Sequence, residues 1–557
     1  MANKKFLHLL FPTLAATLLG LTVSLAASSQ SGRPARPVTR AATEVASTPP
    51  APSGASGASK ADVAADWPPP VKPTPPTACA GRLTGSHATY DVGPGQRFTE
   101  LTDVPWLDLQ AGDVVNVHYR SEPYRTKFGL RAQGTANAPV IINGVTSETC
   151  LRPVISGDKA VTARDARMAQ FGKVIEDAGI ILIYKLPTDD RETYTPRHIV
   201  IQNLKLTGAK IGNRFVNMAG DEQTYSRFSA AIYAVRVHDL TVENCEITGN
   251  GLGVFTNTKG DTPQEYSANV IIRRNLLYQN GNLGSYTEHN LYVQARRALY
   301  EGNFIGQAFG GSSLKDRSSG TVIRYNKILA SARALDLVET EEEQFKVLQQ
   351  DPLYPYAWVY GNLIINDSSA PIGFAVNVIH WGFDNSIERG RNGVLFFYHN
   401  TLVSRVAQKA FWYVVPFQIG RDGLAPPGAT VEAASNVFWQ QSDNEWRFLS
   451  QAGTLKFVGT NHVPPNWYPS KPGSAADVQT KGARMMAGQD PKLDTNGLPL
   501  AGSPVLNQPD AGPSFTPPGA IAENLRVEHQ YKTGVGIVPR PPSGKPGRTA
   551  LGAMAGP

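Results

Sequence analysis

Two polar phrases interrupt the apolar strands between residues 286 and 339. The first reads EHNLY and carries the imidazole of His289; the second reads KDR and carries the amine of Lys315 and the guanidinium of Arg317. An imidazole or an amine can remove a weakly acidic proton, and a guanidinium can neutralise an anion. The candidate catalytic residues are Lys315, His289, Arg317 and Arg333, and the candidate substrate-binding residues are Glu288, Asn290, Tyr292, Asp316 and Asp336.

A repeated phrase supplies the elements that must position these side chains. It consists of a short apolar strand, an Asn and more apolar residues, and it occurs eight times at intervals of roughly 20–50 residues, which is typical of solenoids. The copies are VIQNLKL, TVENCEI, IIRRNLLY, LYEGNFI, VIRYNKIL, VYGNLII, FFYHNTLV and EAASNVFW, with Asn203, Asn244, Asn275, Asn303, Asn326, Asn362, Asn400 and Asn436. Their β-branched residues predict a β-solenoid. The asparagines suit a left-handed bend and a ladder of stacked amides, so we assign them a structural role.

The repeat also places the polar residues relative to one another. Lys315 follows Asn303, and Asp336 follows Asn326, at similar distances along the chain. We therefore expect both segments to occupy the same strand of neighbouring coils, about 4.8 Å apart. The largest interruptions, at residues 209–226, 257–266, 340–354 and 380–392, predict loops that wall a binding face, and the third is polar enough for a short helix.

A purely structural interpretation of the charged residues stays open. Lys315 and Arg317 would then form ion pairs with Asp316, Asp336 or Glu339, since structural networks also gather charges. His289 would be bonded to a neighbouring coil, although its ordinary pKa suits a general base.

The two ends of the repeat region carry further signals. The opening phrase DVGPGQRFTELTDVPWLDLQAGDVVNVHY and the closing phrases QDPKLD, LAGSPVLNQ and ALGAM resemble the first and last coils of pectate-lyase-like right-handed parallel β-helices, over residues 84–553. The resemblance implies an all-β fold, a single right-handed parallel β-helix. We place the helix at residues 83–480, followed by a tail at 481–557 that closes the last coils.

The phrase SSLKDRSSGTVIRYN resembles a stretch of β-helical alginate and chondroitin lyases. In those enzymes the Lys acts as base and an Arg one coil later assists as acid. The resemblance implies that Lys315 is the base, with Arg333 nearest to the second position. It also implies a calcium ion, for which Glu288 and Asn290 are candidate ligands; the metal stays open.

These residues predict a polysaccharide lyase that cleaves an acidic, uronate-containing glycan by β-elimination. Cations would neutralise the uronate carboxylate and stabilise the enolate-like intermediate. A glycoside hydrolase is the first alternative, because Asp316 and Asp336 on adjacent coils suit the roughly 5–9 Å spacing of its two carboxylates. A non-catalytic carbohydrate-binding or surface protein is the second. It predicts an exposed aromatic stripe, for which the candidates are Trp381, Phe383, Trp412 and Tyr413, although such residues are more often part of the core.

The first 82 residues predict export. Lys4 and Lys5, the apolar stretch at residues 6–25 and the small residues after it form a signal peptide at 1–27, with an uncleaved membrane anchor as the alternative. Residues 28–82 are rich in Ala, Pro and Ser and predict a disordered linker. We expect a secreted or periplasmic monomer that does not enter the membrane after cleavage.

Cysteine usage and charge fit that compartment. The chain has 3 cysteines, of which Cys79 and Cys150 bracket the first folded segment and are predicted to form a disulfide, leaving Cys245 as a buried thiol. The net charge of +7 is modest. It permits an anionic polysaccharide partner, whereas the lack of basic runs argues against nucleic acid.

Overall fold

The structure is a computed structural model. It describes residues 79–556 except 166, 168–175, 191–192, 259, 261, 263–264, 342–345, 368–376, 408–412, 511–524 and 544. The predicted signal segment at 1–27 and the predicted linker up to residue 78 lie outside the described residues.

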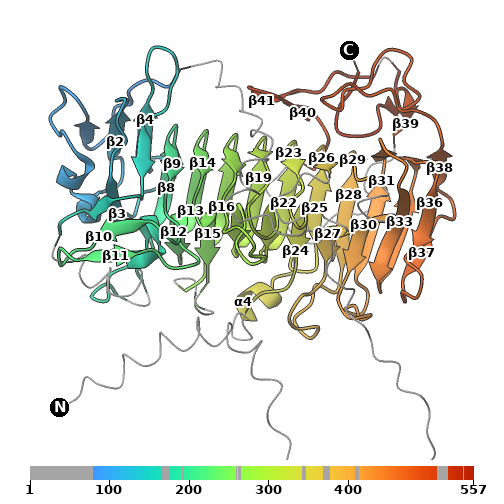
Figure 1. Cartoon of the computed structure of the whole chain (residues 1–557), viewed down its shortest axis with the longest axis horizontal. Coiled ribbons are helices and arrows are strands. Elements are labelled where there is room, and N and C mark those ends of the chain that lie inside the picture. Colours follow the sequence, from blue (N-terminus) through green and yellow to red (C-terminus); the bar gives the residue numbers. More distant parts are fainter. Residues whose placement is uncertain are drawn as a thin grey trace, which may run out of the picture. The chain divides into compact units, whose positions relative to one another are not determined.

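Three parallel sheets dominate the described residues, with 13, 14 and 11 strands (Figure 1). The 13-stranded sheet contains β1 (Thr89–Val92), β2 (Val114–His118), β4 (Val140–Val145), β8 (Arg197–Gln202), β13 (His238–Glu243), β16 (Ala268–Arg273), β19 (Arg296–Glu301), β22 (Ser319–Arg324), β25 (Ala357–Tyr360), β28 (Val394–Tyr398), β31 (Thr430–Ala434), β34 (Thr454–Val458) and β37 (Asp477–Gln479).

The 11-stranded sheet contains β5 (Val154–Ser156), β9 (Lys205–Thr207), β14 (Glu246–Thr248), β17 (Leu276–Tyr278), β20 (Phe304–Ile305), β23 (Lys327–Leu329), β26 (Leu363–Asn366), β29 (Thr401–Ser404), β32 (Val437–Gln440), β35 (Thr460–Val463) and β38 (Arg484–Ala487).

The 14-stranded sheet contains β3 (Thr126–Leu130), β6 (Ala160–Thr162), β7 (Gly179–Ile183), β10 (Arg214–Val216), β11 (Glu222–Thr224), β12 (Ala230–Val235), β15 (Leu252–Asn257), β18 (Leu291–Val293), β21 (Leu314–Asp316), β24 (Leu335–Leu337), β27 (Asn377–Trp381), β30 (Tyr413–Ile419), β33 (Glu445–Gln451) and β36 (Trp467–Ser470). Its β10–β11 pair is antiparallel.

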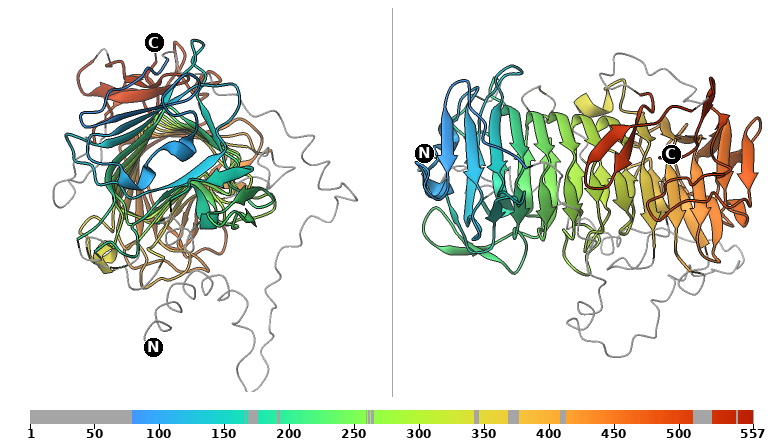
Figure 2. Two further views of the ribbon diagram at one scale, coloured as in Figure 1. Left: turned by 90° about the vertical axis from the view of Figure 1, so that its left-hand side faces the viewer. Right: turned by 90° about the horizontal axis from the view of Figure 1, so that it is seen from above.

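The chain visits the three sheets in turn. β13, β14 and β15 follow one another in sequence and belong to three different sheets, and β16 then pairs in parallel with β13. From β12 to β38 each coil therefore adds one strand to each sheet. The three sheets surround a common interior (Figure 2), and their inward apolar side chains form one continuous core. This confirms the predicted all-β parallel β-helix.

The predicted asparagine ladder is present. In the later coils the Asn275 amide donates to the Asn303 Oδ1 at 3.1 Å, and the same contact recurs coil by coil to Asn461, which the sequence pattern did not reveal. The left-handed bend falls on the Asn itself only at Asn203 and Asn244. In the six later copies it falls on the residue before the Asn, so the ladder amide points inward.

Cys245 occupies this ladder position in its own coil. Its backbone N–H donates to the Asn275 Oδ1 at 2.8 Å, and its thiol lies 3.6 Å from the Ile201 carbonyl. The thiol is fully buried, and burial raises the pKa of Cys245 to about 11. Cys79 and Cys150 form the predicted disulfide.

Short helices and the tail complete the fold. The 3₁₀ turns η1 (Leu101–Asp103) and η2 (Trp106–Asp108) cover the N-terminal end of the core, where Trp106 stacks on Phe128 at 3.7 Å. A third turn is η3 (Glu176–Ala178), and α4 (Lys346–Gln349) is the predicted short helix in the 340–354 loop.

The tail contains the antiparallel pairs β39 (Gln508–Pro509) with β42 (Arg548–Thr549) and β40 (His529–Lys532) with β41 (Gly536–Pro539). It packs back on the turns of the helix, since Tyr325 and Tyr398 donate to tail carbonyls.

Candidate functional site

One row of side chains crosses the 14-stranded sheet in register. The row is Leu182, Tyr233, Phe255, Tyr292, Lys315, Asp336, His380, Gln418 and Ser450. The predicted alignment of Lys315 with Asp336 in neighbouring coils is therefore confirmed. The first part of the row is apolar and aromatic, and it becomes charged and polar at Lys315.

The row faces outward. Leu314 and Leu335, which precede Lys315 and Asp336, both belong to the main core, and side chains alternate between the two faces of a strand. Arg317, two residues after Lys315, lies on the same outer side. These outer groups are nevertheless buried: the side chains of Lys315, Asp336 and Arg317 are only 9%, 4% and 2% exposed.

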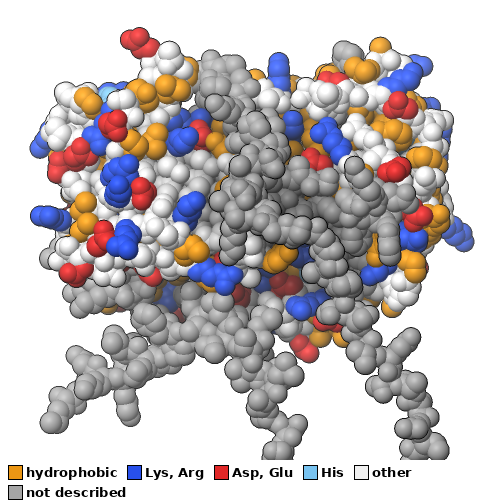
Figure 3. Space-filling view, viewed as in Figure 1, with side chains coloured by type: hydrophobic (Ala, Val, Ile, Leu, Met, Phe, Trp, Pro, Cys, Tyr) orange, Lys and Arg blue, Asp and Glu red, His pale blue; other side chains and the backbone are white. Residues whose placement is uncertain are grey.

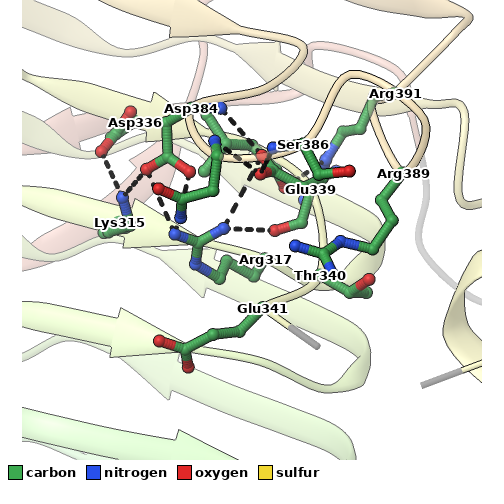
Figure 4. A network of polar contacts seen from close by, with 12 residues as sticks. Lys315, Arg317, Asp336, Glu339, Thr340, Glu341, Asp384, Ser386, Arg389 and Arg391 are labelled. Carbon is green, nitrogen blue, oxygen red and sulfur yellow. Dashed lines mark hydrogen bonds and ion pairs between the residues drawn. The ribbon is translucent and has the colours of Figure 1, made fainter. Parts of the chain in front are cut away.

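Lys315 is the centre of a charged cluster (Figure 4). Its Nζ donates to the Asp336 Oδ2 at 2.9 Å and to the Asp384 Oδ2 at 2.5 Å. The two carboxylate oxygens are therefore no more than about 5.4 Å apart, the sum of these distances. The second oxygen of Asp336 contacts His380 Nδ1 at 2.8 Å, and His380 Nε2 lies 3.1 Å from the Gly420 carbonyl.

Arg317 binds the other side of Asp384. Its Nη2 donates to both carboxylate oxygens of Asp384, at 3.0 and 3.1 Å. Three further contacts fix the guanidinium: Nε to the Tyr292 hydroxyl at 3.1 Å, Nη1 to the Glu339 carbonyl at 2.5 Å, and Nη1 near the Glu339 carboxylate at 3.7 Å. The cluster thus alternates in charge from Asp336 through Lys315 and Asp384 to Arg317.

The cations set the protonation of both aspartates. Burial acts to raise the pKa of Asp336, but the charges of Lys315 and Arg333 and the bond from His380 hold it well below its usual range. Burial likewise opposes ionisation of Asp384, and Arg317 and Lys315 overcome it, so the pKa of Asp384 is also lowered. Both carboxylates are therefore ionised at neutral pH.

His289 lies beside the cluster but is a weak base. Burial, together with the charge of Lys315, lowers the pKa of His289 to about 3. Its Nδ1 accepts the Ser312 N–H at 2.8 Å, so the lone pair is already used. The ring contacts Tyr292 edge-on at 5.5 Å. These contacts match the structural interpretation of this histidine.

Tyr292 and Arg333 complete the surroundings. Burial raises the pKa of Tyr292 well above its ordinary value, so its hydroxyl keeps its proton. Arg333 is half-buried, acts on Asp336 through its charge and donates to the Gln418 Oε1 at 3.2 Å.

Asp316 does not join this outer cluster. It alternates with Lys315 and points into the core, where it is fully buried. Its carboxylate accepts from the Tyr300 hydroxyl at 2.7 Å, the Thr321 hydroxyl at 2.6 Å and the Arg391 guanidinium at 3.2 Å. The side chain therefore neutralises a buried arginine, and the pair Asp316 and Asp336 lies on opposite faces of the sheet.

Glu288 and Asn290 do not fit a calcium site. The Asn290 Oδ1 accepts two N–H groups of Asn280, at 3.2 and 3.0 Å, as part of a second, shorter amide ladder. Glu288 is fully buried and forms an ion pair with Arg227. No group of three or more His, Cys, Asp or Glu side chains within the described ranges is placed to hold a metal ion.

The aromatic stripe that a binding protein would need is not exposed where it is described. Trp381 is fully buried in the main core, Phe383 is 7% exposed, and Tyr413 is half-buried. Trp412 lies outside the described residues. On the face shown in Figure 3, acidic and basic side chains are interspersed.

Two members of the site were not predicted. His380 belongs to the row, but the chain between Asn362 and β27 is longer than in the preceding coils, so counting from the repeat misses it. Asp384 lies in the predicted loop at 380–392, and no periodic signal marks an individual loop residue. The sequence signal that could have pointed to Asp384 is an acidic residue in a long loop next to a charged strand.

Comparison with known proteins finds only distant structural similarities. No family model matches the chain, and no curated protein matches it. An alginate lyase from Paenibacillus sp. str. FPU-7 is 13% identical, with a TM-score of 0.28 over 69% of this chain and 94% of that one. The GH136 lacto-N-biosidase from Eubacterium ramulus is 12% identical, with a TM-score of 0.35 over 72% of this chain and 68% of that one.

The parallel β-helix rests on the strand register, and the function is argued from the site alone. Among the described residues, no helix has the length and hydrophobicity needed to cross a membrane.

Proposed function

We propose that this protein is a polysaccharide lyase that cleaves a uronate-containing glycan by β-elimination at the Lys315–Arg317 cluster. The observation that carries the proposal is the pair of cations that hold one carboxylate on the outer side of the sheet, with distances of 2.5 Å from Lys315 and 3.0 Å from Arg317. The two cations can neutralise a free uronate carboxylate, and this neutralisation makes the proton on the neighbouring carbon easier to remove.

Each residue has a distinct role in this proposal. Arg317 binds the uronate carboxylate. Lys315 first releases its ammonium proton to solvent, and its neutral amine then takes the proton from the carbon next to that carboxylate. The electron pair moves to form the carbon–carbon double bond, and the bond to the glycosidic oxygen breaks. Tyr292 returns a proton to that oxygen; its phenol accepts the bond from Arg317, so its own proton is available, and burial keeps it protonated.

The chemistry of the carboxylates favours elimination over hydrolysis. Glycosidases need one carboxylic acid that holds a proton at working pH. The spacing of Asp336 and Asp384 suits such a pair, but cations lower the pKa of both. His289 has a pKa of about 3, and its Nδ1 already accepts the Ser312 N–H, so it is a poor candidate for the base and leaves Lys315 for that role.

The location of the activity belongs to the same proposal. An N-terminal basic and apolar segment supports export, and the Cys79–Cys150 disulfide supports an oxidising compartment. We propose that the protein acts outside the cytoplasm as a monomer on an extended acidic chain.

A substrate screen tests the proposal. Alginate, pectate and chondroitin are incubated with the protein, and the ultraviolet absorbance of the unsaturated product is followed, with uncharged laminarin as the control. Absorbance that rises with a uronate polymer is expected. New reducing ends without absorbance indicate hydrolysis, and binding without either product indicates the non-catalytic alternative.

A further inference from the structure

The Asp384 carboxylate lies between two cations, Lys315 and Arg317, that are held in place by other residues. Arg317 is fixed by Tyr292 and Glu339, and Lys315 by Asp336, so both cations keep partners on their other sides. Asp384 reaches them from the loop after β27, as Figure 4 shows. We call the space between the two cations the Lys315–Arg317 site.

Asp384 is the most exposed member of the cluster. Its side chain is 19% exposed, compared with 9% for Lys315 and 2% for Arg317. Because solvent reaches this carboxylate and barely reaches the cations, another carboxylate approaching from outside would meet Asp384 first.

The loop backbone is anchored independently of the Asp384 side chain. The Glu339 carboxylate accepts the N–H groups of Asp384, Asn385 and Ser386, at 2.9, 2.8 and 2.8 Å. Arg421 donates to the Asp384 carbonyl at 2.7 Å. The carboxylate can therefore leave the cations by side-chain rotation while the loop stays in place.

From these contacts we propose that Asp384 is an internal substitute for the substrate carboxylate. A uronate carboxylate displaces it from the Lys315–Arg317 site. This inference rests on the proposed function and extends it, because it assigns the uronate group to a named site and gives the free protein an occupant there.

The exchange couples recognition to catalysis. In the free protein Lys315 donates to two carboxylates, whereas a base must present a lone pair to the substrate. A sugar carboxylate held by Arg317 releases Lys315 from Asp384, and Lys315 then gives its extra proton to solvent, which exposes the lone pair of the amine. A neutral sugar has no group that competes for Arg317, so it leaves the lysine occupied and is rejected.

Removal of the internal carboxylate tests the proposal. Asp384→Ala and Asp384→Asn are compared with the wild type and with Glu388→Gln, an exposed residue of the same loop that contacts Ser386. Binding of sodium glucuronate and of glucose is measured by titration calorimetry on the full chain, in a buffer without carboxylates. Asp384→Asn is included because its amide still accepts from Arg317 and preserves the local packing.

Both Asp384 variants are expected to bind glucuronate at least about tenfold more tightly than the wild type and Glu388→Gln, because no internal carboxylate has to leave the Lys315–Arg317 site first. Glucose binding stays undetectable. Adding Arg317→Gln to Asp384→Ala abolishes the gain. Equal or weaker glucuronate binding by the Asp384 variants, binding that survives Arg317→Gln, or no binding by any variant overturns the proposal.

The glucuronate-binding experiment measures no turnover, so its result is independent of whether the protein is a lyase. Tight glucuronate binding by an inactive protein keeps the site and removes the lyase. Elimination activity with unchanged glucuronate binding keeps the lyase and removes the exchange.

Discussion

Replacing Lys315 with Met separates a catalytic lysine from a structural one. The Lys315 ammonium is 9% exposed and lies between Asp336 and Asp384, so Lys315→Met leaves two ionised carboxylates close together in a buried place. Breaking a buried pair costs about 3–5 kcal/mol. Asp336 keeps His380 and Asp384 keeps Arg317, so we expect the lower end, about 3 kcal/mol of unfolding free energy.

The double variant Lys315→Met with Asp336→Asn removes both members of one pair. The Asn oxygen can still accept from His380, so we expect a recovery of about 1–2 kcal/mol relative to Lys315→Met alone. The control is Lys456→Met, because Lys456 is 48% exposed and pairs with Glu432 at 3.5 Å; we expect less than about 1 kcal/mol there.

Urea unfolding followed by tryptophan fluorescence measures these changes, and elimination rates on the active polymer are measured in parallel. Lys315→Met and the double variant should both lose at least about 100-fold in turnover, the usual contribution of a positioned base. If turnover returns together with stability in the double variant, Lys315 has a structural role only and the assignment of the base is wrong.

Three other predictions concern the scaffold. Burial holds the pKa of His289 near 3, below its unfolded value of about 6.5, so its contribution to stability is present above pH 6.5 and is lost as the pH falls. Between pH 7 and 5 the wild type should lose about 2 kcal/mol of unfolding free energy that His289→Gln does not lose. Urea unfolding at both pH values measures this difference. Asn362→Ala leaves buried polar groups in both neighbouring coils without partners and should cost at least about 2 kcal/mol in unfolding free energy. The exposed Asn137→Ala should cost less than about 0.5 kcal/mol, and equal costs contradict the ladder. Cys245 should react with a thiol reagent only after unfolding, and labelling of the native protein contradicts its burial.

The repeat made the fold and part of the site predictable. Asparagines such as Asn303 and Asn326 mark equivalent points in successive coils, and this was enough to align Lys315 with Asp336. The alternation of strand side chains also implies that Asp316 faces inward once Lys315 faces outward, although spacing between charges alone suggested a pair with Asp336.

The remainder of the site depends on features without periodicity. Asp384 comes from an irregular loop, and its position is set by the capture of three loop N–H groups by Glu339. The burial that makes His289 a weak base is a property of packed coils, which local sequence does not express.

The reaction type is tested most directly by product analysis in water labelled with heavy oxygen. A uronate polymer that the protein cleaves is digested in this water, and the fragments are analysed by mass spectrometry. Elimination creates the new chain ends without adding water, so we predict fragments with an unsaturated end, each lighter than the hydrolysis product by one water. Labelled oxygen enters these fragments only by slow exchange of the anomeric hydroxyl at the reducing end. Saturated fragments with one labelled oxygen at each cleaved bond would show hydrolysis and contradict the account.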